Sequence, residues 1–367
     1  MRLLGHVLRP YALAAVLAIA SVVASVAVAT SLGLPLRDPD GFLGPAYVRL
    51  PAAVLAMMVI DVVPRAIYRR SRVLDVVRER YGWERIVLVA AGLTVFYLSY
   101  VSYRNLKSAL PFARPDVVDR QLLELDRLMA FGFNPAVVLH EVFGTGVVAY
   151  VLSGVYLFYL GFVPLSLAAA LVWGRSARTG SWYVTALCLN WLLGVATYYL
   201  VPSLGPVFVR PELYADLPPT GVAAMQENLA AARLAVLADP VGAGTIASVA
   251  GFASLHVSVV FTAAIVAHRL RLPQLLRSSL WLFLGATMLA TAYFGWHYLV
   301  DIIAGLALGA VAARVAEHAS GRTGARSPSD ESTTGPAASG KDLRPVGARA
   351  SVPATTRLSR GDGAARS

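Results

Sequence analysis

The stretch from Val147 to Trp173 reads VVAYVLSGVYLFYLGFVPLSLAAALVW and contains no charged residue. An apolar run of this length can cross a bilayer as one helix, because about 20 helical residues span the hydrocarbon core. Seven further apolar stretches show the same pattern, which predicts an all-α polytopic membrane protein with about eight transmembrane helices. The expected spans are Tyr11–Leu34, Tyr47–Val63, Ile86–Tyr103, Val147–Trp173, Trp182–Val201, Leu255–His268, Ser279–Tyr293 and Tyr298–Val315.

The amino-acid composition supports a membrane setting. Hydrophobic residues make up 57% of the 367 residues and charged residues only 14%, which is far from the balance of a soluble domain. The formal net charge is +11. We interpret the surplus of basic residues as a determinant of membrane topology and as a source of attraction to lipid surfaces. Nucleic acid is not an expected partner. The single cysteine, Cys188, lies inside an apolar run and is expected to be a small buried hydrophobic residue.

The arginines divide the loops between the two sides of the membrane. Arginine clusters follow the second, fourth and sixth expected spans, so the positive-inside rule places these loops and both termini in the cytoplasm. Residues 35–46, 104–146 and 202–254 and the turn around Gly295 then face outward. The first span is expected to be an uncleaved anchor, although Ala27-Val-Ala29 also fits a signal-peptide cleavage site.

Two outward segments have helical periodicity of their own. Residues 117–143 alternate apolar and charged positions, and residues 219–240 hold an alanine-rich stretch. Both are expected to form surface amphipathic helices over the mouth of the bundle. Inside the fifth span, Asn190 is expected to bond a neighbouring helix. Four aromatic residues of that span are expected to form interfacial belts: Trp182, Trp191, Tyr198 and Tyr199.

Two histidines and an aspartate come at the outer ends of the last spans. Ser254 and His256 stand at a helix entrance, where free backbone amides favour an anion such as phosphate. His297 and Asp301 are four residues apart and share one helix face. The carboxylate can accept from one ring nitrogen and leave the other as a nucleophile. Because ionisable groups are costly beside hydrocarbon, the three residues form a candidate catalytic site.

These segments resemble a known family. Ala253-Ser-Leu-His256 and His297-x-x-x-Asp301 are similar to the second and third signature motifs of the type 2 phosphatidic acid phosphatase (PAP2) superfamily. The string from Tyr293 to Gly305 is more similar to the branch that contains inositol phosphorylceramide synthases and sphingomyelin synthases. Three earlier segments resemble that branch too: Tyr103-Arg-Asn-Leu-Lys107, Glu124-Leu-Asp-Arg-Leu128 with Asn134-Pro135, and Val201-Pro-Ser-Leu-Gly-Pro206.

The resemblance divides the chain into three regions. Residues 86–316 are expected to form a PAP2-like catalytic membrane domain with a six-helix core. Residues 1–85 are expected to form an N-terminal two-helix membrane hairpin with a basic cytoplasmic loop. Residues 317–367, rich in Ser, Thr, Gly, Pro and Arg, are expected to be a disordered cytoplasmic tail.

The resemblance also implies a reaction, namely phosphoryl or headgroup transfer on a lipid through a phosphohistidine, without a metal ion or cofactor. His297 is expected to attack the phosphorus, Asp301 to orient the ring, and His256 to protonate the departing oxygen and then activate the acceptor. The expected substrate is a phospholipid or another lipid phosphate. The acceptor stays open between water, as in a phosphatase, and an alcohol, as in an inositolphosphotransferase. The expected location is the plasma membrane, with the active site extracytoplasmic.

Charge on the phosphoryl oxygens must be met by cations or amides. The phosphatase pattern has an arginine six residues before the nucleophilic histidine, where this chain has Thr291. Lys107 is the preferred cation, because it is one of only two lysines and lies just beyond the third span on the outer face. The other expected substrate-binding residues are Arg104, Arg114, Arg210 and Ser254. Each arginine can instead be an interfacial anchor whose side chain reaches the headgroups.

A hypothesis from another class is a non-catalytic lipid transporter or scaffold, in which the polar cluster lines a passage. The remaining histidines are not placed together with a second histidine and an aspartate, and they are expected on the surface: His6, His140, His268 and His318. The sequence leaves the oligomeric state open.

Overall fold

The computed structural model describes residues 9–38, 44–174 and 176–321. Within these ranges the regular secondary structure is helical throughout, so the predicted all-α fold is confirmed. Seven of the described helices are long and apolar enough to cross a membrane, as expected for a polytopic membrane protein. His6 and residues 322–367 of the predicted tail lie outside the described residues.

The long helices follow the predicted spans in order. They are α2 (Ala12–Leu32, preceded by the 3-10 turn η1, Arg9–Tyr11), α3 (Ala46–Arg69), α5 (Trp83–Ala113), α8 (Val147–Trp173), α9 (Ala177–Leu200), α13 (Gln274–Tyr293) and α14 (Leu299–Ala319). The sixth predicted span is the shorter apolar helix α12 (Leu255–Arg269). Helix α13 starts five residues earlier than Ser279, so the seventh span extends into its flank.

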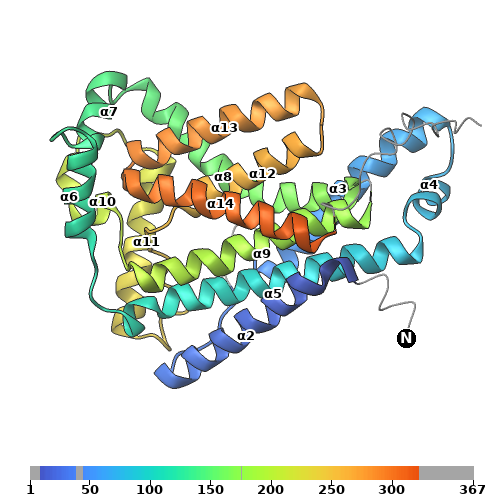
Figure 1. The fold of residues 1–367 in the computed structure, drawn as a ribbon, viewed down its shortest axis with the longest axis horizontal. Helices are drawn as coiled ribbons and strands as arrows, with labels where there is room; N and C mark the ends of the chain where they lie inside the picture. The colour runs from blue at the N-terminus through green and yellow to red at the C-terminus, as the bar shows by residue number, and fades with distance from the viewer. Residues whose placement is uncertain (1–8, 39–43, 175, 322–367) are drawn as a thin grey trace, which may run out of the picture. The chain divides into compact units, whose positions relative to one another are not determined.

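Shorter helices connect the long ones. They are α4 (Val73–Arg80), α6 (Asp119–Met129), α7 (Pro135–Phe143), α10 (Pro206–Val209), η2 (Pro211–Tyr214) and α11 (Gly221–Ala238). Figure 1 shows α6, α7 and α10 at one end of the long helices and α4 at the other. The predicted amphipathic segment 117–143 is two helices, because the Asn134 side chain accepts from the Ala136 amide at 3.0 Å and starts a new helix at Pro135.

Helix α5 continues to Ala113, well beyond the predicted end at Tyr103. Its last turns stay helical because Leu106 and Leu110 are buried against the neighbouring helices. Arg104 and Lys107 therefore project from a helix rather than from a loop, which corrects the sequence prediction.

Close packing joins α12 to α14 through glycine. A Cβ atom at Gly305 would lie 2.5 Å from the Ser254 carbonyl oxygen, and one at Gly309 would lie 2.6 Å from that of Ser258. Small residues at this spacing let two helix backbones approach each other closely. Asn190 adds polar contacts between helices, because its amide donates to Thr262 Oγ1 at 3.0 Å and its carbonyl oxygen accepts from Ser258. The predicted role of Asn190 is confirmed.

The long helices place the arginine-rich segment before α5 and the first turns of α12 and α14 at opposite ends of the bundle (Figure 1). At one end, Arg85 donates to the Gly174 carbonyl oxygen at 3.2 Å, which joins the start of α5 to the end of α8. At the other end, the Ser254 amide donates to the Asp301 carbonyl oxygen at 3.0 Å, so α12 and α14 begin side by side. The arginine-rich turn before α5 is thus remote from the first turns of α12 and α14.

Candidate active site

His256 and His297 are in direct contact. Nδ1 of His256 lies 3.1 Å from Nε2 of His297. His256 comes from the first turn of α12, whereas His297 comes from the turn between α13 and α14. His256 is half-buried and His297 is only 5% exposed. Two imidazoles at this distance can pass a proton to each other or to a group placed between them.

Asp301 lies on the far side of the His297 ring. Its Oδ2 atom is 3.4 Å from His297 Nδ1, and the same oxygen accepts from the Tyr298 amide at 3.0 Å. Asp301 is fully buried. In the described part of the chain, neither His297 Nδ1 nor Asp301 Oδ1 has a hydrogen-bond partner. The carboxylate is therefore fixed by the helix start and faces Nδ1, which leaves Nε2 toward His256.

Ser254 caps the helix that carries His256. Its hydroxyl accepts from the Val257 amide at 3.4 Å, and its side chain is completely buried. Its backbone also bonds to Asp301, as described above. Ser254 therefore contacts the candidate site through its backbone bond to Asp301, whereas its hydroxyl is engaged in the helix cap.

Aromatic rings enclose the His256 imidazole. The ring centroids of Tyr156 and Tyr159 lie 4.8 Å and 4.5 Å from that of His256. Trp296 stacks on Tyr156 at 5.1 Å, and its indole nitrogen has no hydrogen-bond partner in the described chain. These rings restrict access of water to one side of the histidine pair and fix the orientation of His256.

Lys107 and Arg104 stand on one face of α5 near this pair. Lys107 Nζ lies 5.1 Å from the centroid of the Tyr198 ring, and its charge is close enough to act on His256. Arg104, one turn earlier, donates to Ser248 Oγ at 2.9 Å and to the Tyr100 hydroxyl at 3.2 Å. Both side chains are half-buried. They supply positive charge at the same end of the bundle as the histidines.

The two other arginines have partners elsewhere. Arg114 is exposed and donates to the Tyr199 carbonyl oxygen at 2.7 Å. Arg210 is paired with Glu212 on the surface. Thr291, at the position of the missing arginine, is buried and bonds to the Met288 carbonyl oxygen at 3.0 Å. The structure does not bring Arg114 or Arg210 into contact with the histidine pair.

The predicted interfacial belt of α9 is wrong for three of its four residues. Trp182, Trp191 and Tyr198 are buried inside the bundle. Trp182 donates to the Ala313 carbonyl oxygen at 2.8 Å, and Tyr198 lies beside Lys107. These rings pack between helices because α9 is surrounded by α5, α12 and α14.

Two acidic residues that the sequence analysis overlooked touch the segment around His297. Asp119 accepts from the Tyr298 hydroxyl at 2.8 Å and from the Leu204 amide at 3.0 Å. Asp126 accepts from the Leu299 amide at 2.8 Å. Burial raises the pKa of both carboxyl groups, that of Asp126 to about 7, against the lowering effect of the amide hydrogen bonds. The signals in the sequence are that both acids fall on one face of a helix and that Asp126 lies in the segment Glu124–Leu128, which resembles the synthase branch.

The other described histidines differ in their surroundings. His268 and His318 are exposed, as predicted. His140 is half-buried, and its Nε2 atom lies 2.9 Å from the Tyr293 carbonyl oxygen. The surface prediction is therefore wrong for His140, because α7 folds back onto the end of α13.

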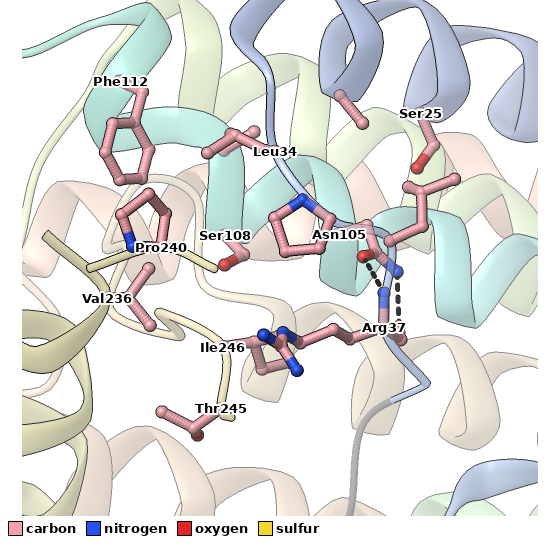
Figure 2. Close-up of a pocket in the computed structure, with 14 residues that line it drawn as sticks. Ser25, Leu34, Arg37, Asn105, Ser108, Phe112, Val236, Pro240, Thr245 and Ile246 are labelled. Atoms are coloured by element: carbon pink, nitrogen blue, oxygen red, sulfur yellow. Dashed lines mark hydrogen bonds between the residues drawn. The ribbon is translucent and has the colours of Figure 1, made fainter. Parts of the chain in front are cut away.

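A small cavity lies away from these residues, between the end of α2, the segment before α3, α5 and the chain around Ile246. Figure 2 shows Asn105 at its wall, bonded to the backbone of Arg37 through both its amide nitrogen (2.7 Å) and its carbonyl oxygen (2.8 Å). The cavity volume of about 20 Å³ suits a single water molecule. The cavity is too small for a substrate, and its wall fixes the segment before α3 against α5.

Among the described residues, no group of three or more His, Cys, Asp or Glu side chains is arranged to hold a metal ion.

Comparison with known proteins gives one match. The family model described as the PAP2 superfamily matches residues 120–315, which is more than half of the chain. The match contains the histidine pair and ends one residue before the predicted boundary at 316, but it starts after α5. No curated protein and no solved structure matches the chain significantly. The synthase-like branch stays a prediction.

Proposed function

The chain belongs to the PAP2 superfamily, and we propose that it is an integral-membrane enzyme that transfers a phosphate-bearing group from a lipid through a phosphohistidine on His297. The observation that carries this proposal is the placement of His256 and Asp301 on the two nitrogens of one ring, at 3.1 Å and 3.4 Å. An imidazole with a proton donor beside one nitrogen and a carboxylate beside the other has the partners that covalent catalysis requires.

In the first half of the reaction, Nε2 of His297 forms a bond to phosphorus while the bond from phosphorus to the lipid oxygen breaks. The proton on His256 passes to that departing oxygen, and Asp301 holds the proton on Nδ1 of His297. In the second half, the acceptor gives its proton to His256, forms the new oxygen–phosphorus bond and releases His297. The phosphoryl group must separate the two imidazoles, which touch in the free protein.

Lys107 and Arg104 are proposed to meet the negative charge on the phosphoryl oxygens. Their half-buried positions at the end of α5 support this role, because charge interactions are stronger away from bulk water. Arg114 and Arg210 are assigned a lesser part, as anchors at the surface. Ser254 is proposed to act through its cap of α12 and its backbone contact with Asp301.

We further propose that the site faces the extracytoplasmic side of the plasma membrane, with both termini in the cytoplasm. The separation of the arginine-rich turns from the histidine pair along the bundle supports this orientation. An alcohol acceptor is favoured over water, because His297 is 5% exposed and the aromatic rings shield His256. The resemblance to synthases favours the same acceptor, of the inositolphosphotransferase type. The substrate is a phospholipid or another lipid phosphate.

Purified protein incubated with phosphorus-labelled phospholipids, with and without inositol or diacylglycerol, tests this function. We expect a new labelled lipid or headgroup ester that depends on the added alcohol. Free phosphate alone would assign the protein as a phosphatase. His318→Ala, an exposed histidine on the same helix as Asp301, is the matched control for His297→Ala. If His297→Ala turned over substrate like the control, His297 would not be the nucleophile. If no lipid reacted with the wild-type protein, the chain would be better described as a lipid transporter or scaffold.

A further inference from the structure

Helix α6 buries two carboxyl groups on the face that packs against the segment after His297. Asp119, Leu122 and Asp126 are buried, whereas Glu124 and Leu128 on the other faces are exposed. Two buried carboxyl groups on an 11-residue helix are costly, since each loses hydration. Such groups persist where hydrogen bonds to them fix a geometry.

Asp126 receives the first amide of α14. Its Oδ1 atom accepts from the Leu299 amide at 2.8 Å, one of the amides that a helix start leaves without an internal partner. The preceding Tyr298 amide goes to Asp301 instead. A residue of α6 therefore completes the cap of α14, the helix that carries Asp301. This helix begins two residues after His297.

Asp119 holds the same turn from a second direction. It accepts from the Tyr298 hydroxyl at 2.8 Å and from the Leu204 and Gly205 amides at 3.0 Å. Gly205 has φ +105°, and a Cβ there would lie 2.5 Å from the Trp296 carbonyl oxygen. Both chain neighbours of His297 are thus fixed, Tyr298 by Asp119 and Trp296 by the close approach of Gly205.

We propose that Asp119 and Asp126 are positioning residues that hold the first turn of α14, so that His297 keeps the geometry for attack. This role rests on the proposed function of the same site. The two acids touch Tyr298 and Leu299 but not the reacting atoms, so they act through His297 and Asp301. A displacement of about 1 Å at a reacting group can reduce the rate roughly 100-fold.

The charges around α6 give the role a measurable signature. Asp126 faces Asp301 and Tyr214, and Asp119 faces Asp301, Tyr298 and Arg233 of α11. Because burial raises the pKa of Asp126 to about 7, its ionisation adds negative charge beside Asp301 near neutral pH. Replacement by asparagine removes this ionisation and keeps an acceptor for the Leu299 amide.

Four variants test the proposal: Asp119→Ala, Asp126→Ala, Asp119→Asn and Asp126→Asn. Glu124→Gln, on the exposed side of α6, is the matched control. We expect the alanine variants to lose about 10- to 100-fold in kcat with a KM change under about threefold. The asparagine variants should recover most of kcat, and Asp126→Asn should change the pH profile near 7. Hydrogen exchange at the amides of residues 298–300 should accelerate in the alanine variants only.

Two outcomes would overturn the proposal. One is kcat within about twofold of wild type in the alanine variants once the folded fraction is equal. The other is unchanged exchange at residues 298–300. Hydrogen exchange does not depend on turnover. It therefore tests the contacts of Asp119 and Asp126 with the start of α14 even if the wild-type protein proves inactive on every lipid. In that case the proposed function fails, while the measured exchange still shows whether α6 holds the start of α14.

Discussion

Nδ1 of His256 lies 3.1 Å from Nε2 of His297, although the two residues are 41 positions apart. Their distance is set by how closely α12 approaches α14. Gly305 lies against the Ser254 carbonyl oxygen at this contact, two residues before His256. The geometry of the histidine pair therefore depends on a glycine that touches neither ring.

Gly305→Ala should push the start of α12 away from α14, because its Cβ would lie 2.5 Å from a backbone oxygen. Overpacking of this kind costs about 1–3 kcal/mol, and we expect both the melting temperature and kcat to fall. Gly285→Ala in α13 is the matched control, since nothing lies within 4 Å of its added methyl group. Equal behaviour of the two variants in thermal unfolding and turnover would show that the close contact does not set the site.

His256→Ala should slow the reaction about 100- to 10,000-fold, the range associated with general acid–base catalysis. The loss should shrink when the substrate carries a good leaving group such as nitrophenol, because that group departs without a proton. Steady-state rates on both substrates provide the test. An equal loss on both substrates would assign His256 a role other than proton donor to the leaving oxygen.

Lys107→Gln should lower kcat/KM about 100-fold, as expected when a charge that stabilises the transition state is removed. Arg114→Gln, at an exposed position after the end of the same helix, should leave kcat/KM within about threefold. Kinetics at several salt concentrations would show the difference. Similar effects of both substitutions would indicate that positive charge acts on the substrate from a distance rather than at the phosphate.

The stability of the fold should depend on the protonation of Asp126. Burial raises its folded pKa to about 7, so its protonated form favours the folded state. This contribution is complete below about pH 4, the unfolded value, and is lost as the pH rises to about 7. The melting temperature of Asp126→Asn should therefore rise relative to wild type between about pH 4 and pH 8. A constant difference across this range would contradict the assignment.

The sequence predicts the long helices well, because hydropathy and length decide which segments can cross a bilayer. The end of α5 escapes this signal. Arg104 and Lys107 lower the local hydropathy and suggest a loop, yet the helix continues because Leu106 and Leu110 pack on neighbouring helices. Interior and lipid-facing aromatic residues look alike in sequence, so the sequence predicts an interfacial position for Trp182 although this residue is buried.

The candidate site also contains some residues that the sequence predicts and others that it does not. His297 and Asp301 come together as their spacing of four residues suggests, although His297 lies in the turn before α14 and not on the helix itself. Asp119 and Asp126 could not be recognised, because their partners are far away in the chain. Leu204 is 85 residues from Asp119, and Leu299 is 173 residues from Asp126. Only the folded bundle brings these amides to α6.

The covalent intermediate is the central claim, and trapping it is the most direct test. Wild-type protein is mixed with a phosphorus-labelled phospholipid, quenched within one turnover, digested and mapped. We predict acid-labile, base-stable label on the peptide that contains His297, none in His297→Ala, and label in the control His318→Ala. Label on another residue, or turnover by His297→Ala at the wild-type rate, would contradict the account.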